Sequence, residues 1–194
     1  MSARSASRQP IGRVLRFSRA TASRYGKLTL MTTKEAFTDE EWTRLMRAPF
    51  VAGMAISLAD PGGPIEAFKE TAATLKAVLA AERGGDSELV GAISQDAAAH
   101  ARERKNPLAG FKPTSAATAG VEILDELKAA HGIAAEKATP EEAEALATWL
   151  LAVAQSAADA AKEGGFMGFH AERVSQGEQR MLDSIRDALG APAA

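Results

Sequence analysis

Cysteine is absent from the 194-residue chain, and aromatic residues make up only 5% of it. The lack of cysteine excludes a disulfide framework, a thiolate zinc site and a cysteine nucleophile, and it fits the reducing cytoplasm, where we expect the protein to be located. Because β-strands are usually rich in β-branched and aromatic residues, the scarcity of aromatics together with abundant alanine favours packed helices.

Long hydrophobic runs are absent as well. The longest charge-free apolar segments are residues 48–59 and 146–158, and both are well short of the ~20 residues that a helix needs to cross a bilayer. We therefore predict that both are buried core helices, and we expect no membrane span.

Acidic residues are missing from the first 30 residues, which contain seven Lys or Arg residues. Subtracting these seven from the chain's 23 basic residues leaves 16 against 25 acidic ones, so residues 31–194 have a formal charge of −9. This acidic body disfavours nucleic-acid binding except through the basic segment, because phosphate binding needs a basic face.

The charge pattern predicts two parts: a basic, flexible arm at residues 1–30 and a single helical domain at residues 31–194. Three interpretations of the arm compete. It resembles a mitochondrial-type transit peptide, it could be an arm that contacts nucleic acid, or it is upstream sequence before a true start at Met31. The third is favoured, because "MTTKEAFTDEEW" resembles an ordinary protein beginning.

Three capping boxes predict where helices begin. In this motif a Ser or Thr at the N-cap and a Glu three residues later each accept a hydrogen bond from the other's backbone N–H. The pairs are Thr38 with Glu41, Thr139 with Glu142, and Ser175 with Glu178. Phe37 should pack on Trp42 as a hydrophobic staple across the first of these starts.

Apolar residues at spacings of three and four predict six helices. They cover about residues 38–59, 65–82, 87–105, 115–130, 140–163 and 176–189. Pro49 predicts a kink or a break in the first helix, and Gly132 predicts a C-terminal cap for the fourth. The predicted fold class is an all-α, antiparallel bundle of five to seven helices with the first and fifth at its centre.

The first two predicted helices resemble the last two. Each pair has a long apolar helix that contains a Trp, followed by an acidic residue, Gly-Gly and an amphipathic helix. An internal repeat of two similar helical hairpins is therefore one alternative for the architecture.

Residues 158–190 contain "ADAAKEGG" and "VSQGEQRMLDSIRDALG", and residues 58–70 contain a poorer match, "LADPGGPIEAFKE". These segments resemble the TerB-like family of all-helical bacterial proteins associated with tellurite and other stress resistance. The resemblance implies a helical bundle, in the cytoplasm or near the membrane, with acidic positions that bind a divalent cation. The chain departs from the family pattern by inserting "FMGFHAERV" between the glycines and the capping box.

The candidate metal ligands are Asp159, Glu163, His170 and Glu178. Asp159 and Glu163 are four residues apart on one helical face, and a hard cation such as Ca²⁺ or Mg²⁺ needs several such oxygens, whereas a transition metal would use the imidazole. The alternative interpretation is purely structural: the acidic pair is a solvated helix end, and Glu178 only caps its helix.

The loop at residues 164–174 has two interpretations. Phe166 and Phe169 could be buried, which would make the loop a structural connector, or exposed, which would make it a docking surface for a protein partner. The connector is the favoured interpretation. A phosphate cradle is disfavoured, because the three glycines of this loop follow a helix rather than a strand.

The sequence contains no convergent nucleophile, base and orienting group, and His100 and His131 lack partners at catalytic or metal-ligand spacing. We therefore interpret the chain as a non-catalytic helical binding or scaffold protein of bacterial stress physiology, with no cofactor indicated. The alternative is a divalent-metal-binding protein or a metal-dependent enzyme that uses the acidic cluster. An oligomer is compatible with the sequence.

Deleting residues 1–30 should leave the melting temperature nearly unchanged, because the arm has no apolar periodicity with which to dock on the helical domain. Thermal unfolding of the full chain and of residues 31–194, followed by circular dichroism, measures the difference. A loss of several degrees would show that the arm packs on the domain.

Overall fold

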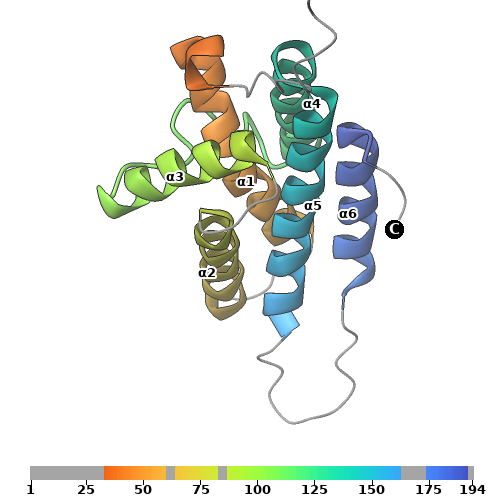
Figure 1. The fold of residues 1–194 in the computed structure, drawn as a ribbon. Helices are drawn as coiled ribbons and strands as arrows, with labels where there is room; N and C mark the ends of the chain where they lie inside the picture. The colour runs from red at the N-terminus through yellow and green to blue at the C-terminus, as the bar shows by residue number, and fades with distance from the viewer. Residues whose placement is uncertain (1–32, 60–63, 83–86, 163–173, 192–194) are drawn as a thin grey trace, which may run out of the picture. The chain divides into compact units, whose positions relative to one another are not determined.

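The computed structural model describes residues 33–59, 64–82, 87–162 and 174–191, all of which belong to the unit formed by residues 31–194. This part of the chain is helical and contains no strand (Figure 1). Its elements are the 3₁₀ helix η1 (Lys34–Ala36) and the α-helices α1 (Asp39–Ala59), α2 (Pro64–Ala81), α3 (Glu88–Arg102), α4 (Ala119–Lys137), α5 (Pro140–Lys162) and α6 (Gln176–Leu189). The predicted all-α bundle of five to seven helices is confirmed.

Helices α1 and α5 are the centre of the bundle, as predicted. Each of them packs against the other five α-helices. Their apolar side chains, among them Leu45 and Ile56 of α1 and Leu146 and Leu150 of α5, are fully buried. In Figure 1, α5 lies between α2 and α6, while α3 crosses the direction of these helices. Burial of these side chains in one continuous core is the main stabilising contribution to the fold.

All three predicted capping boxes are present. At the start of α1, the backbone N–H of Thr38 donates to Glu41 Oε2 at 2.7 Å, and the N–H of Glu41 donates to Thr38 Oγ1 at 3.3 Å. The same reciprocal bonds join Thr139 to Glu142 at α5 and Ser175 to Glu178 at α6. They satisfy N–H groups that have no partner inside the helix.

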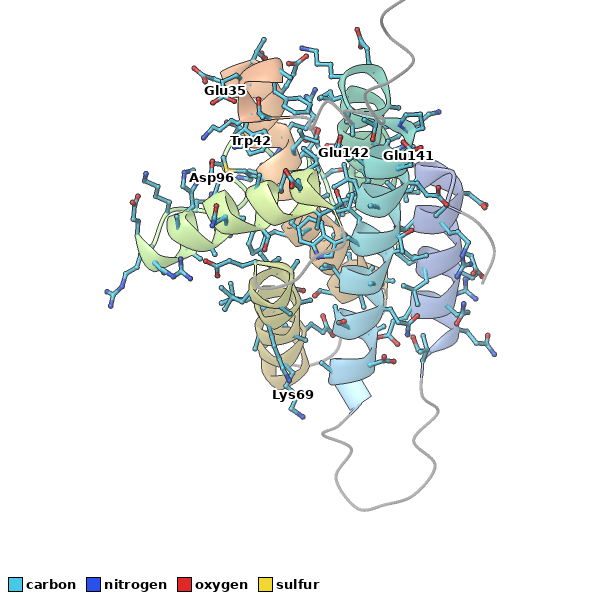
Figure 2. The ribbon with its side chains drawn as sticks, viewed as in Figure 1. Glu35, Trp42, Lys69, Asp96, Glu141 and Glu142 are labelled. Carbon is cyan, nitrogen blue, oxygen red and sulfur yellow. The ribbon has the colours of Figure 1, made fainter. Side chains whose placement is uncertain are left out.

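The predicted staple of Phe37 on Trp42 also forms, with ring centroids 5.5 Å apart. The indole N–H of Trp42 donates to Asp96 Oδ2 of α3 at 2.9 Å, and Lys34 Nζ lies 2.5 Å from the same oxygen. Figure 2 shows Trp42 and Asp96 next to each other. Burial alone would raise the pKa of Asp96, but the hydrogen bonds from Lys34 and Trp42 outweigh it and lower the pKa. This contact joins the start of α1 to α3.

Helix α1 continues through Pro49 without a break, so of the two predicted alternatives only the kink stays a prediction. The nearby residues Ala48 and Val51 are fully buried, and their packing helps to offset the ~3 kcal/mol that an internal proline costs. The predicted end of α4 is wrong. Helix α4 does not end before Gly132 but continues through it to Lys137. The reason is tertiary, since Ala134 beyond the glycine is fully buried in the core.

Two further boundaries differ by a few residues. Helix α3 ends at Arg102 rather than near residue 105, because Arg104 adopts a left-handed conformation (φ 56°) that an α-helix cannot contain. Helix α4 begins at Ala119 rather than near residue 115. The connection between α3 and α4 is therefore longer than the sequence predicted.

A buried ion pair holds this connection against the bundle. Arg47 of α1 donates from Nε to Glu126 Oε1 of α4 at 2.7 Å, and its Nη1 donates to the carbonyl oxygen of Ala109 at 3.1 Å. Arg44 donates to the same carboxylate oxygen at 3.1 Å. A Cβ at Gly110 would lie 2.8 Å from Arg47 Nη1, so the glycine allows the close approach. One guanidinium thus joins α1, α4 and the connection between α3 and α4.

Replacing Arg47 with Met should lower the free energy of unfolding by about 3 kcal/mol, because it leaves the buried Glu126 carboxylate short of a partner. The matched variant Arg44→Met should cost less than about 1 kcal/mol, since the Arg44 side chain is 31% exposed and that of Arg47 only 8%. Urea unfolding measures both. The double variant Arg47→Met/Glu126→Met should recover much of the loss, and equal losses for the two single variants would contradict a special role of the buried pair.

Replacing Gly132 with Ala should raise the free energy of unfolding by about 0.5–1 kcal/mol, because alanine is favoured in a helix interior. A Cβ there meets no heavy atom within 4 Å. Gly190 is the control: it caps α6 with φ 60°, so Gly190→Ala should lower stability by ~1 kcal/mol. If Gly132→Ala lowered the free energy of unfolding as much as Gly190→Ala, Gly132 would instead have the left-handed conformation of a helix cap.

Candidate functional site

An open groove of about 710 Å³ lies between α2, the start of α3 and α5. We call it the α2–α5 groove. Its wall on α2 consists of Ala77, Ala80 and Ala81, and its wall on α5 includes Ala145, Trp149 and Ala152. Val90 of α3 and Val153 of α5 also line it. The lining is therefore mostly apolar, with one aromatic ring.

The groove exists because the facing side chains are short. Residues three and four apart lie on one face of a helix, so Ala77, Ala80 and Ala81 form a single alanine surface on α2. On α5, Ala145 and Ala152 lie one turn before and nearly one turn after Trp149 on the same face. Leucines at these positions would fill the space, as they do in the core. Alanine leaves it open.

Trp149 has a polar group that the fold does not satisfy. Its indole Nε1 is buried and has no hydrogen-bond partner among the described residues. The other tryptophan differs, because the indole N–H of Trp42 donates to Asp96. A buried donor without a partner costs about 1–3 kcal/mol, and in a native protein such a group calls for an explanation.

The polar lining residues are concentrated on α5. Glu141 and Glu144 are exposed carboxylates near the beginning of this helix, and Figure 2 shows Glu141 next to Glu142 there. Thr148 and Ser156 line the groove further along, and Ser156 Oγ donates to the carbonyl oxygen of Ala152 at 2.8 Å. Among the described lining residues there is no Lys, Arg or His. The charge that these residues bring to the groove is negative.

A second, smaller cavity of about 440 Å³ lies where α4, α5 and the end of α6 meet. Its lining includes His131, Leu189 and Gly190, and it shares Glu144 with the α2–α5 groove. Burial lowers the pKa of His131. The imidazole is therefore more often neutral at a given pH than an exposed histidine.

Of the four predicted metal ligands, Glu163 and His170 lie outside the described residues. Asp159 is exposed on α5 and accepts a hydrogen bond from Gln155 Nε2 at 3.1 Å. Glu178 is buried, and its carboxylate completes the capping box of α6. In the described ranges, no three His, Asp or Glu side chains are grouped to hold a metal ion. A site completed by Glu163 and His170 stays a prediction.

The predicted interaction loop also falls largely outside the described residues. Phe166 and Phe169 are among the residues not described, so the choice between connector and docking surface stays open to experiment. At the end of the loop, Val174 packs against the core. At the end of α3, Arg102 forms an ion pair with Glu82, and just beyond it Lys105 pairs with Glu103.

The α2–α5 groove was missed by the sequence analysis. Residues 146–158 were interpreted as a helix covered all round, and the groove lies along one side of that helix. The available signal was the alanine spacing on α2, at residues 77, 80 and 81, because an alanine face gives its neighbour little to pack against.

The chain matches no protein-family model, no curated protein and no solved structure. Within the described residues, no helix is long and apolar enough to cross a membrane.

Proposed function

We propose that the protein is a non-catalytic binding protein whose site is the α2–α5 groove, and that it takes a small, largely apolar ligand. The observation that supports this proposal most is the apolar lining of the groove, made by alanines of α2 and α5 together with Trp149. The groove volume of about 710 Å³ is within the range of roughly 300–1,000 Å³ that is usual for small-molecule sites.

The chemistry of the lining supports binding rather than catalysis. Two of the three described hydroxyl groups of the groove have structural partners: Ser87 accepts from Val90 at the start of α3, and Ser156 donates back to its own helix, whereas Thr148 is exposed. Among the described lining residues there is no histidine or lysine to act as a base, and the ionisable groups are the exposed carboxylates of Glu141 and Glu144. A ligand would gain mainly by removing apolar surface from water.

The physiological setting is proposed from sequence alone. The similarity of residues 158–190 to the TerB-like pattern supports a role in bacterial stress physiology, and the absence of cysteine supports a cytoplasmic location. In this setting the protein would capture or carry an apolar small molecule rather than transform it.

Filling the groove should weaken binding without unfolding the protein. Ala80 and Ala152 line the groove and are exposed, so Leu at either position projects into the groove rather than into the core. We expect the wild type to bind the neutral fluorescent probe N-phenyl-1-naphthylamine with a stoichiometry of one. The Kd should increase at least about tenfold in Ala80→Leu and Ala152→Leu, because the added side chain occupies the volume that the probe needs.

The control is Ala72→Leu, which places the same side chain at an exposed position of α2 outside the groove. It should bind the probe like the wild type, and thermal melts should show all three variants folded. Unchanged binding in both groove variants would contradict the proposed site.

A further inference from the structure

We infer that the ligand of the α2–α5 groove is an amphiphilic cation, with an apolar body along the alanine walls and an ammonium-type group between Trp149 and the carboxylates of Glu141 and Glu144. This inference rests on the proposed function, since it names the chemical class that the same site would take. Four features carry it: the charge of the lining, the position of the carboxylates, the aromatic ring and the uncharged lining beyond that ring.

The charge of the lining has one sign. Glu141 and Glu144 are its only charged side chains among the described residues. The surroundings do not reverse this, because residues 31–194 have 16 basic against 25 acidic residues. The lining carboxylates would repel an anionic ligand. They would attract a cation during its approach as well as in the bound state.

The position of the carboxylates separates a polar end of the groove from an apolar end. Glu141, Ala145, Trp149 and Ala152 follow one another at intervals of three and four along α5, so they share a face. Glu144 precedes Trp149 by five residues, which is roughly 7.5 Å of helix. Beyond Trp149 the described lining of α5 is uncharged: Ala152 and Val153 are followed by the hydroxyl of Ser156, roughly 10 Å further along the axis, which is bonded to its own helix. A ligand with one charged end and one apolar end matches this order.

The aromatic ring adds a second attraction for a cation. The face of an indole carries negative quadrupolar charge, and aromatic rings near carboxylates recognise alkylated ammonium groups in this way. Glu141 and Glu142 also stabilise the positive end of the α5 helix dipole, whereas Glu144 lies one turn further along the helix. Glu144 is therefore expected to contribute more to ligand binding than Glu141.

Three ligands with the same octyl chain test the inference: octyltrimethylammonium, octanol and octyl sulfate. Each is titrated below its micellar concentration against N-phenyl-1-naphthylamine bound to the full-length protein. We expect the cation to displace the probe with a Kd at least about tenfold below that of octanol, and the sulfate to bind more weakly than octanol. Raising the salt concentration should weaken binding of the cation and leave octanol nearly unchanged.

Glu144→Gln and the double variant Glu141→Gln/Glu144→Gln test the carboxylates. Both should bind octanol like the wild type, and the double variant should lose most of the preference for the cation. The control is Glu40→Gln/Glu136→Gln, which removes the same charge from exposed positions outside the groove and should keep the preference. Thermal melts of all variants confirm folding.

The outcomes distinguish this inference from the proposed function. Equal affinity for the cation and octanol in the wild type, or tighter binding of the sulfate, would overturn the inference and leave an apolar site in place. A preference for the cation that survives in the double glutamine variant would overturn it as well. If none of the three ligands binds and the neutral probe does not bind either, the proposed function fails together with the inference.

Discussion

The buried contact of Arg47 with Glu126 is the interaction on which the arrangement of the helices depends. The connection between α3 and α4 has few apolar residues to anchor it, and Leu108 and Phe111 are only partly buried. A guanidinium can join three partners at once because its N–H groups point in several directions in one plane. Here those partners are a carboxylate on α4, a carbonyl oxygen of the connection and, through its own backbone, α1.

The consequences extend to both cavities. Helix α3 precedes the anchored connection, and its start forms one side of the α2–α5 groove. Helix α4 follows it and carries His131 of the smaller cavity. A buried ion pair adds little net stability compared with apolar packing, but a buried charge without a partner is costly. The pair therefore favours the helix arrangement in which the charges of Arg47 and Glu126 meet. The ion pair thus holds α4, which lines the smaller cavity, and the connection that follows α3.

Alanine explains both the close packing of the bundle and its open groove. Fully buried alanines such as Ala48, Ala52 and Ala55 of α1 let backbones approach closely in the core. Gly53 beside them is an extreme case, because a Cβ there would collide with Thr74 of α2. At the surface, the same short side chains cannot span the gap between α2 and α5. The groove therefore lies where alanines of α2 and α5 form its walls.

The sequence by itself determined the features that depend on neighbours within a few residues. The capping boxes at Thr38, Thr139 and Ser175 are correct because a side chain and a backbone N–H three residues apart meet whatever the rest of the chain does. The all-α class and the central position of α1 and α5 were also predictable, since a helix that is apolar on most faces must be surrounded by others.

Only the tertiary structure decided the features that depend on distant segments. Gly132 has the local signature of a helix end, but burial of Ala134 in the core carries α4 past it. Arg47 and Glu126 are distant in sequence, and no local pattern pairs them. The α2–α5 groove requires alanines from α2 and α5 to lie on its two walls beside the start of α3, and no local pattern predicts that arrangement. Side-chain spacing shows which residues share a helix face, but the packing of the helices decides which faces are covered and which are left open.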